Sequence, residues 1–171
     1  MIKIGTRSSK LALYQSNLVK DKLSNIYPEL DFLLIQIKTK GDKIQDRNLD
    51  RNLDKGFFVK EIQEQLLKNE IDIAVHSLKD LPVENNPEII TSAILERGNH
   101  KDVFISNEKK KLSEFTSDNK IGTSSLRRKA QLLSMNPKLK VEDIRGNVDT
   151  RISKMTKGCL LYTSPSPRDR G

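Results

Sequence analysis

The sequence has few of the residues from which disulfide frameworks, metal centres and base-stacking surfaces are built. It contains one cysteine, Cys159, and two histidines, His76 and His100, in 171 residues. One cysteine excludes an internal disulfide, and this set is too small for a structural zinc site, so we predict no metal. Tryptophan is absent and aromatic residues make up 5% of the chain. Few side chains are therefore available to stack on nucleic-acid bases, which argues against a nucleic-acid binder.

Long apolar segments are also missing. No run approaches the ~18 apolar residues that a membrane-spanning helix needs. The first ten residues, MIKIGTRSSK, lack the apolar core of a secretory signal. We therefore predict a cytoplasmic protein without a membrane partner. The chain does have an excess of basic residues, with 31 Lys and Arg against 23 Asp and Glu and a net charge of +8. That excess predicts an anionic partner but leaves open whether it is nucleic acid, phosphate or a polycarboxylate.

Short apolar segments alternate with amphipathic ones along the chain. The apolar segments predict strands, and the segments with apolar residues at helical spacing predict helices. This alternation is typical of an α/β fold with a largely parallel sheet. The expected strands are 2–5, 32–38, 71–76, 89–95, 102–106 and 139–145, and the expected helices run from Ser8 or Ser9 to Pro28, from Gly56, through 126–133 and from near Asn147.

Two parts of the chain repeat the same pattern. IGTRSS at 4–9 and IGTSS at 121–125 each place a strand, a glycine turn, a hydroxyl cluster and a helix start in that order. The repeat predicts two similarly built lobes, 1–98 and 99–158, although a similarity of six residues also arises by chance. The last thirteen residues, 159–171, break the pattern with CLLYTSPSPRDRG. They resemble the translation of a sequencing adapter, the alternative being an ordinary disordered tail, and we assign no chemistry to Cys159.

Three basic clusters are suited to anions. A helix N-terminus offers unpaired N–H groups and partial positive charge, to which Ser, Thr and Arg side chains add donors. Simple N-capping beside surface arginines explains the clusters at Arg7 and at Arg127 equally well. A solvent-exposed helix start explains the cluster at Arg145 equally well. The clusters are Arg7 with Ser9, Thr123–Ser125 with Arg127 and Arg128, and Arg145 with Arg151.

Two further segments contain candidate functional residues. Asp80 follows the strand 71–76, at the end where α/β folds build sites, and a lone carboxylate there can stabilise a cation or orient an N–H donor. An ion pair with Lys79 or an arginine is an equal alternative, and His76 fits a packing residue better than a base. Lys55 lies beside Gly56 in a segment that is either a loop closing over a ligand or a helix flanked by surface lysines.

Five motifs then point to a family. GTRSSKLAL, KGFFVKEI, DIAVHSLKDLP, GTSSLRRKAQL and RGNVDTR occur in this order between residues 1 and 158. In this order and spacing they resemble porphobilinogen deaminase, also called hydroxymethylbilane synthase. Members of that family are transferases of tetrapyrrole (porphyrin) and haem biosynthesis. They join four porphobilinogen molecules head to tail and release ammonia at each step.

The resemblance implies a role for each matching residue. It implies that Asp80 is the catalytic carboxylate. It implies that the substrate carboxylates are held by Arg7, Ser9, Lys55, Ser77, Arg145 and Arg151, and that the dipyrromethane cofactor is held by Lys79, Thr123, Ser124, Ser125, Arg127 and Arg128.

The resemblance also implies an incomplete fold. Family members have two lobes like type II periplasmic binding proteins and a third domain with the cofactor cysteine. Here the second lobe is truncated and the third domain is absent, so we expect the parent, a monomer, to be the active form and this chain to be inactive alone. The loop also departs from the family, with Leu53-Asp54 where Gly-Gly is usual. The alternatives are a small-anion binding module and a nucleic-acid binder.

Overall fold

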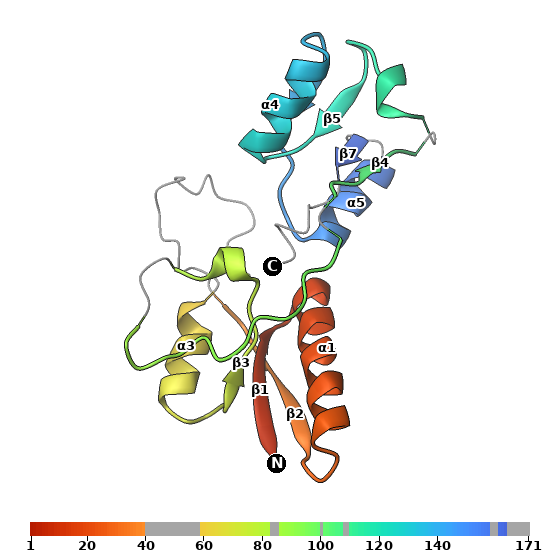
Figure 1. Ribbon diagram of the computed structural model, residues 1–171. Coiled ribbons are helices and arrows are strands. Elements are labelled where there is room, and N and C mark those ends of the chain that lie inside the picture. Colours follow the sequence, from red (N-terminus) through yellow and green to blue (C-terminus); the bar gives the residue numbers. More distant parts are fainter. Residues whose placement is uncertain (40–58, 83–85, 100, 108–109, 158–160, 164–171) are drawn as a thin grey trace. The chain divides into compact units, whose positions relative to one another are not determined.

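The computed structural model describes residues 1–39, 59–82, 86–99, 101–107, 110–157 and 161–163. The chain divides into two compact units, the first ending at Gly98 and the second beginning at Asn99. Figure 1 shows the elements of each unit. We describe the units one at a time.

The first unit is a parallel three-stranded sheet with a helix on each side. The strand order is β2-β1-β3, and both helices pack on β1, α1 also on β2 and α3 also on β3. The connection from β1 to β2 and the connection from β2 to β3 run in opposite directions across the sheet. Because connections between parallel strands are right-handed, the two helices cover opposite faces of the sheet. The elements are β1 (Ile2–Arg7), α1 (Lys10–Ile26), β2 (Phe32–Ile37), α3 (Lys60–Leu67), β3 (Ile73–Ala74) and a 3₁₀ helix, η1 (Leu78–Asp80).

The core of the first unit requires a glycine in its central strand. Ile37, Ile62 and Ile71 form a buried cluster between the sheet and α3. A Cβ atom at Gly5 would overlap the side chain of Ile71 and would come within 3.2 Å of Ile37. Gly5 in β1 therefore allows two large side chains to close over the middle of the sheet.

The second unit has four short strands in the order β4-β7-β5-β6. Strand β5 runs parallel to β6 and β7, whereas β4 pairs with β7 in the antiparallel sense. Phe115, Ile121, Leu132 and Leu139 form its main core, and the ring of Phe104 meets that of Phe115 edge-on. The elements are β4 (Phe104–Ile105), a 3₁₀ helix η2 (Leu112–Glu114), β5 (Lys120–Gly122), α4 (Leu126–Met135), β6 (Lys140–Glu142), α5 (Val148–Thr156) and β7 (Leu161–Thr163).

The structure confirms a mixed α/β protein with parallel sheets and corrects one detail. The strand predicted at 89–95 is absent: this segment has no regular structure, and Ile90 is 81% and Ile94 72% exposed. The apolar residues of this segment favour a strand, but a strand also needs a hydrogen-bonded neighbour. Among the described residues no strand pairs with the segment. Residues 161–163, which lie in the segment expected to be a non-native tail, form β7 between β4 and β5. Within the described ranges, every helix is too short or too polar to cross a membrane.

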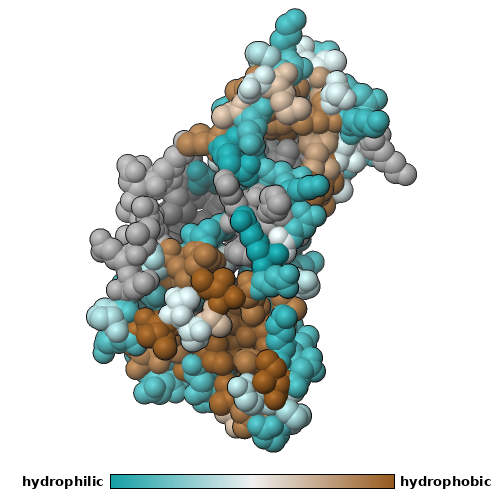
Figure 2. Space-filling view, in the orientation of Figure 1, coloured by the Kyte–Doolittle hydropathy of each residue, from teal (hydrophilic) through white to brown (hydrophobic). Residues whose placement is uncertain are grey.

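Much apolar surface is exposed in the first unit. Figure 2 shows hydrophobic surface over the face of this unit that is turned to the viewer. Large side chains contribute on several elements, among them Ile26 at the end of α1, Leu33 in β2, and Ile90 and Ile94 in the irregular segment.

Candidate functional site

The carboxyl edge of the first sheet gathers the predicted residues of that unit. Strand β1 ends at Arg7, and Ser9 caps α1 by accepting a hydrogen bond from the Ala12 N–H on its Oγ, at 3.3 Å. The loop after β3 leaves the same edge, since Val75 donates its N–H to the carbonyl of Gly5 at 3.2 Å. Parallel strands bring such loops together at their carboxyl ends, which is where α/β proteins place their sites.

Asp80 is held in this loop by its backbone. The Asp80 N–H donates to the carbonyl of Ser77 at 2.9 Å and so closes the 3₁₀ turn η1. Ser77 is buried, and its Oγ donates to Oε1 of Gln15 on α1 at 3.2 Å. This bond ties the Asp80 loop to the helix that begins at Ser9. Asp80 is half-buried, whereas Lys79 is exposed.

His76 lies near the positive charge of Arg7 at this edge. Burial, and then the charge of Arg7, lower the pKa of His76 from 6.5 to about 4. The imidazole is therefore neutral at pH 7 and lacks the second ring proton that an imidazolium acid would donate. This agrees with its interpretation as a packing residue, and it places the guanidinium of Arg7 close enough to His76 to act on its charge.

The second unit repeats this arrangement at the end of β5. Thr123 follows the strand, is buried, and donates its N–H to the carbonyl of Glu142 at 2.8 Å. The Ser124 Oγ donates to the carbonyl of Ile144 at 2.9 Å. These two bonds hold the hydroxyl cluster beside the loop that follows β6 and leads to Arg145.

Ser125 is the N-cap of α4, as the repeat predicted. Its Oγ accepts a hydrogen bond from the Arg128 N–H at 3.4 Å, and its own N–H donates to Oγ1 of Thr123 at 3.2 Å. Both helix starts singled out in the sequence thus use a serine as cap, Ser9 in one unit and Ser125 in the other. Each cap uses a lone pair of the serine Oγ as acceptor, so the hydroxyl hydrogen takes no part in the cap and capping does not prevent donation to an anion.

Arg127 and Arg128 share a carboxylate that the sequence analysis missed. Asp102 accepts hydrogen bonds from both guanidinium groups at 2.8 to 3.2 Å. Asp102 lies 25 residues before Arg127, and nothing in the local pattern joins them. The one feature of the sequence that could have pointed to Asp102 is its position just before the apolar segment that forms β4.

The third basic cluster is shaped by a glycine. Gly146 has φ +114°, where a Cβ atom would meet the side chain of Thr150 at 2.9 Å. This conformation, which residues with a Cβ rarely adopt, turns the chain from β6 into α5. Arg145 is exposed, and its carbonyl accepts a hydrogen bond from Nζ of Lys154 at 3.2 Å. Arg151 lies half-buried one turn into α5.

The predicted residues therefore fall into two groups. Arg7, Ser9, Ser77, Lys79 and Asp80 follow the strands of the first sheet. Thr123, Ser124, Ser125, Arg127, Arg128, Arg145 and Arg151 follow the strands of the second. Lys55 lies outside the described residues.

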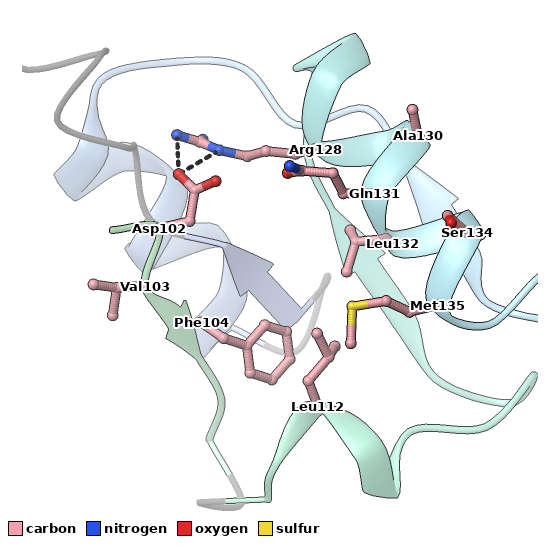
Figure 3. A pocket seen from close by; sticks show the side chains of 10 residues that line it. All are labelled: Asp102, Val103, Phe104, Leu112, Arg128, Ala130, Gln131, Leu132, Ser134 and Met135. Atoms are coloured by element: carbon pink, nitrogen blue, oxygen red, sulfur yellow. Dashed lines mark hydrogen bonds and ion pairs between the residues drawn. The ribbon is translucent and has the colours of Figure 1, made fainter. Parts of the chain in front are cut away.

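A cavity of about 660 Å³ opens in the second unit between α4 and the β4–η2 segment. Figure 3 shows the Asp102–Arg128 ion pair at one end and the side chains of Phe104, Leu112, Leu132 and Met135 at the other. Of the predicted site residues that the structure describes, Arg128 alone lines this cavity, and it does so with its guanidinium paired to Asp102. The cavity is too apolar to receive a ligand with several carboxylates, so we do not assign that ligand to it.

Parallel strands whose carboxyl ends carry hydroxyl groups and arginines define an α/β protein with loops suited to anions. Comparison with protein families then narrows this class. The family model described as "Porphobilinogen deaminase, dipyromethane cofactor binding domain" matches residues 2–163, and the chain therefore belongs to the porphobilinogen deaminase family. The match extends into residues 159–163, within the segment expected to be a non-native tail.

Curated relatives agree with this family. The chain is 50% identical over 155 residues to a porphobilinogen deaminase of Chloroherpeton thalassium, covering 91% of this chain and 49% of the relative. It is 48% identical over 156 residues to that of Brevibacillus brevis, covering 91% and 50%. It is 50% identical over 159 residues to that of Geobacter sulfurreducens, covering 93% and 50%. The chain thus spans about half the length of these relatives.

Proposed function

We propose that this chain is the part of a porphobilinogen deaminase that holds the catalytic carboxylate and most of the ligand-binding cations. The whole enzyme would be a transferase that condenses four porphobilinogen molecules head to tail to hydroxymethylbilane and releases one ammonia per step. The observation that supports this most directly is the position of Asp80 at the carboxyl edge of a parallel sheet, the edge at which strand β1 ends in Arg7. Family membership does not favour the alternative of a small-anion binding module.

The charges of the described residues fit such a substrate. Porphobilinogen carries one acetate and one propionate, so each added ring brings two carboxylates into the site. Arginine suits these groups because its planar fork donates two parallel hydrogen bonds to a carboxylate. We assign the substrate carboxylates to Arg7, Ser9, Ser77, Arg145 and Arg151, with Lys55 as a sixth contact.

Asp80 is assigned the chemical role. The reaction expels the aminomethyl nitrogen as ammonia, and positive charge develops on the pyrrole as the bond breaks. A carboxylate within reach of the pyrrole N–H would stabilise that charge, and it acts more strongly where water is partly excluded. Asp80 is half-buried in a turn that is hydrogen-bonded to Ser77, which restricts where its carboxylate can lie.

The residues of the second unit fit the dipyrromethane named in the family model. Thr123, Ser124, Ser125, Arg127 and Arg128, together with Lys79 of the first unit, supply hydroxyl, guanidinium and ammonium donors, which are the partners that its carboxylates need. When bound, this group supplies the pyrrole end to which the first substrate is joined. We place its attachment cysteine in the part of the relatives that this chain does not span, and exclude Cys159. For that reason the isolated chain should not turn over.

The architecture and setting of the whole enzyme belong to the same proposal. We assign residues 1–98 to a first lobe and 99–158 to an incomplete second lobe, both of the type II periplasmic-binding-protein kind, and 159–171 to a non-native tail. We also propose that the whole enzyme is monomeric and cytoplasmic and that it acts on a small molecule, with no nucleic-acid or membrane partner.

A chimera tests the proposal. Residues 1–158 would be joined to the remaining half of the Geobacter sulfurreducens relative, and tetrapyrrole formation from porphobilinogen would be measured beside the isolated 171-residue chain. We expect turnover from the chimera and none from the isolated chain. A folded chimera that carries dipyrromethane but forms no tetrapyrrole would refute the proposed activity, and turnover by the isolated chain would refute its dependence on the missing half.

A further inference from the structure

We propose that Asp102 is a positioning residue that orients the guanidinium groups of Arg127 and Arg128 toward the carboxylates of the dipyrromethane. This inference rests on the proposed function and adds to it a residue that the family motifs in the sequence did not single out. Asp102 would not touch the ligand itself. It would act through the two arginines.

The geometry is that of one carboxylate shared by two guanidinium groups. Arg127 donates from Nη1 to Oδ2 of Asp102 at 2.8 Å and from Nη2 to Oδ1 at 3.2 Å. Arg128 approaches Oδ1 with both Nε and Nη2, each at 3.2 Å. Figure 3 shows the two contacts of Arg128 converging on one oxygen of Asp102. Paired contacts of this kind fix the plane of a guanidinium as well as its position.

Burial gives the two arginines different roles. The side chain of Arg128 is only 4% exposed, so its charge needs a partner inside the protein. Arg127 and Asp102 are 34% and 31% exposed and reach solvent. Arg127 also donates from Nη1 to Oε1 of Gln131 at 2.9 Å, one turn further along α4. The side chain of Arg127 is therefore held from two sides at the solvent-facing end of the cluster.

The cluster keeps a net positive charge. Burial raises the pKa of Asp102, but the hydrogen bond from Arg127 and the charges of Arg128 and Arg127 outweigh burial and hold that pKa below its ordinary value. Asp102 is thus ionised at neutral pH and cancels one of two positive charges. The three side chains together carry a charge of +1, and the orientation of the two guanidinium groups is already set. Such preorganisation reduces the entropy lost on binding.

The variant Asp102→Asn separates the effect of guanidinium orientation on ligand binding from the effect of net charge. Asp102→Asn makes the chain more positive by one unit, so simple Coulomb attraction predicts tighter binding of an anion. Loss of orientation predicts weaker binding. Glu142→Gln is the matched control, because it changes the charge equally in the same unit and breaks only the exposed ion pair between Lys120 and Glu142, at 2.8 Å.

Two measurements on the full 171-residue chain decide the matter. The first is the dissociation constant of a free dipyrromethane bearing acetate and propionate groups, by calorimetry. We expect Asp102→Asn to weaken binding by at least about tenfold, as lost charge-assisted bonds would, and Glu142→Gln to change it by less than about twofold. The second is ¹⁵N relaxation of the Arg127 and Arg128 Nε–H groups, which should become mobile in Asp102→Asn and not in Glu142→Gln.

A third variant tests the route of the effect. In an Arg127→Gln, Arg128→Gln background, Asp102→Asn should weaken binding no further, because the groups that it orients are gone. A purely structural role would instead lower the melting temperature of each Asp102 variant without this dependence. Circular dichroism spectra and melting curves of every variant identify any that fail to fold, and Asp102→Glu should then restore part of the binding.

The outcomes are distinct. Equal binding by the unaltered chain and Asp102→Asn, with rigid Nε–H groups in both, would overturn the role of Asp102 and leave the proposed function intact. No binding of the dipyrromethane by the unaltered chain, with the Nε–H groups rigid, would overturn the cofactor assignment and the ligand part of this inference together.

Discussion

Acidification from pH 7 to pH 5 should destabilise the first unit through one histidine. In the folded chain the pKa of His76 is lowered from 6.5 to about 4, by burial and then by Arg7. The unfolded chain therefore binds a proton between these two values that the folded chain does not bind. The stabilisation is complete above the unfolded pKa and is lost as the pH falls from about 6.5 toward 4.

The size of this effect follows from the two pKa values. Linkage gives a loss of about 2 kcal/mol in the free energy of unfolding between pH 7 and pH 5, and a loss approaching ~3 kcal/mol near pH 4. The upper part of this range is the better test, because most carboxylates stay ionised above pH 5. A loss of this size is a large share of the net stability of a small domain.

Urea unfolding at pH 7 and pH 5 measures the loss, and NMR titration of the imidazole signals measures its cause. His76→Asn should lose about 2 kcal/mol less than the unaltered chain between these pH values, whereas a His100→Gln control should keep the full dependence. Arg7→Gln should raise the pKa of His76 part of the way, and Lys68→Gln, an equal change of charge before β3 begins, should not. A His76 signal that titrates near 6.5 would refute the burial of this side chain beside Arg7.

Two further predictions concern the N-cap of α4 and the glycine in the middle of β1. Ser125→Ala should cost about 1 kcal/mol of stability in thermal or urea unfolding, because the N-cap bond to the Arg128 N–H is lost; the exposed Ser134→Ala in the same helix is the control, and equal costs would contradict the capping role. Gly5→Ala should cost about 1–3 kcal/mol by overpacking against Ile71. Adding Ile71→Val should recover part of that loss, and strictly additive costs would contradict the overlap.

The parts of the fold that local chemistry determines could be read from the sequence. Alternating strands and helices, the stops at proline and the serine caps at Ser9 and Ser125 all depend on neighbours within a few residues, and the structure shows each of them. The carboxyl-edge position of Asp80 followed from the same reasoning, because it depends only on where a parallel strand ends.

The features that the sequence did not reveal depend on distant partners. The segment 89–95 has the composition of a strand, but a strand also needs a neighbour to pair with, and that is not a local property. Asp102 lies 25 residues from Arg127, and no spacing rule connects them. Strand β7 (Leu161–Thr163) lies in the segment expected to be a non-native tail, and its partners β4 and β5 are distant in the sequence.

The central claim is that Asp80 is the carboxylate that drives ring addition. Its most direct test is the rate of tetrapyrrole formation by the chimera carrying Asp80→Asn, with dipyrromethane content measured by mass spectrometry and Asp21→Asn, an exposed carboxylate on α1, as control. We expect Asp80→Asn to retain dipyrromethane and to lose on the order of a hundredfold or more in rate, as when a group that stabilises transition-state charge is removed, while Asp21→Asn stays near the unaltered rate. An Asp80→Asn chimera that folds, carries dipyrromethane and turns over at the unaltered rate would contradict the claim.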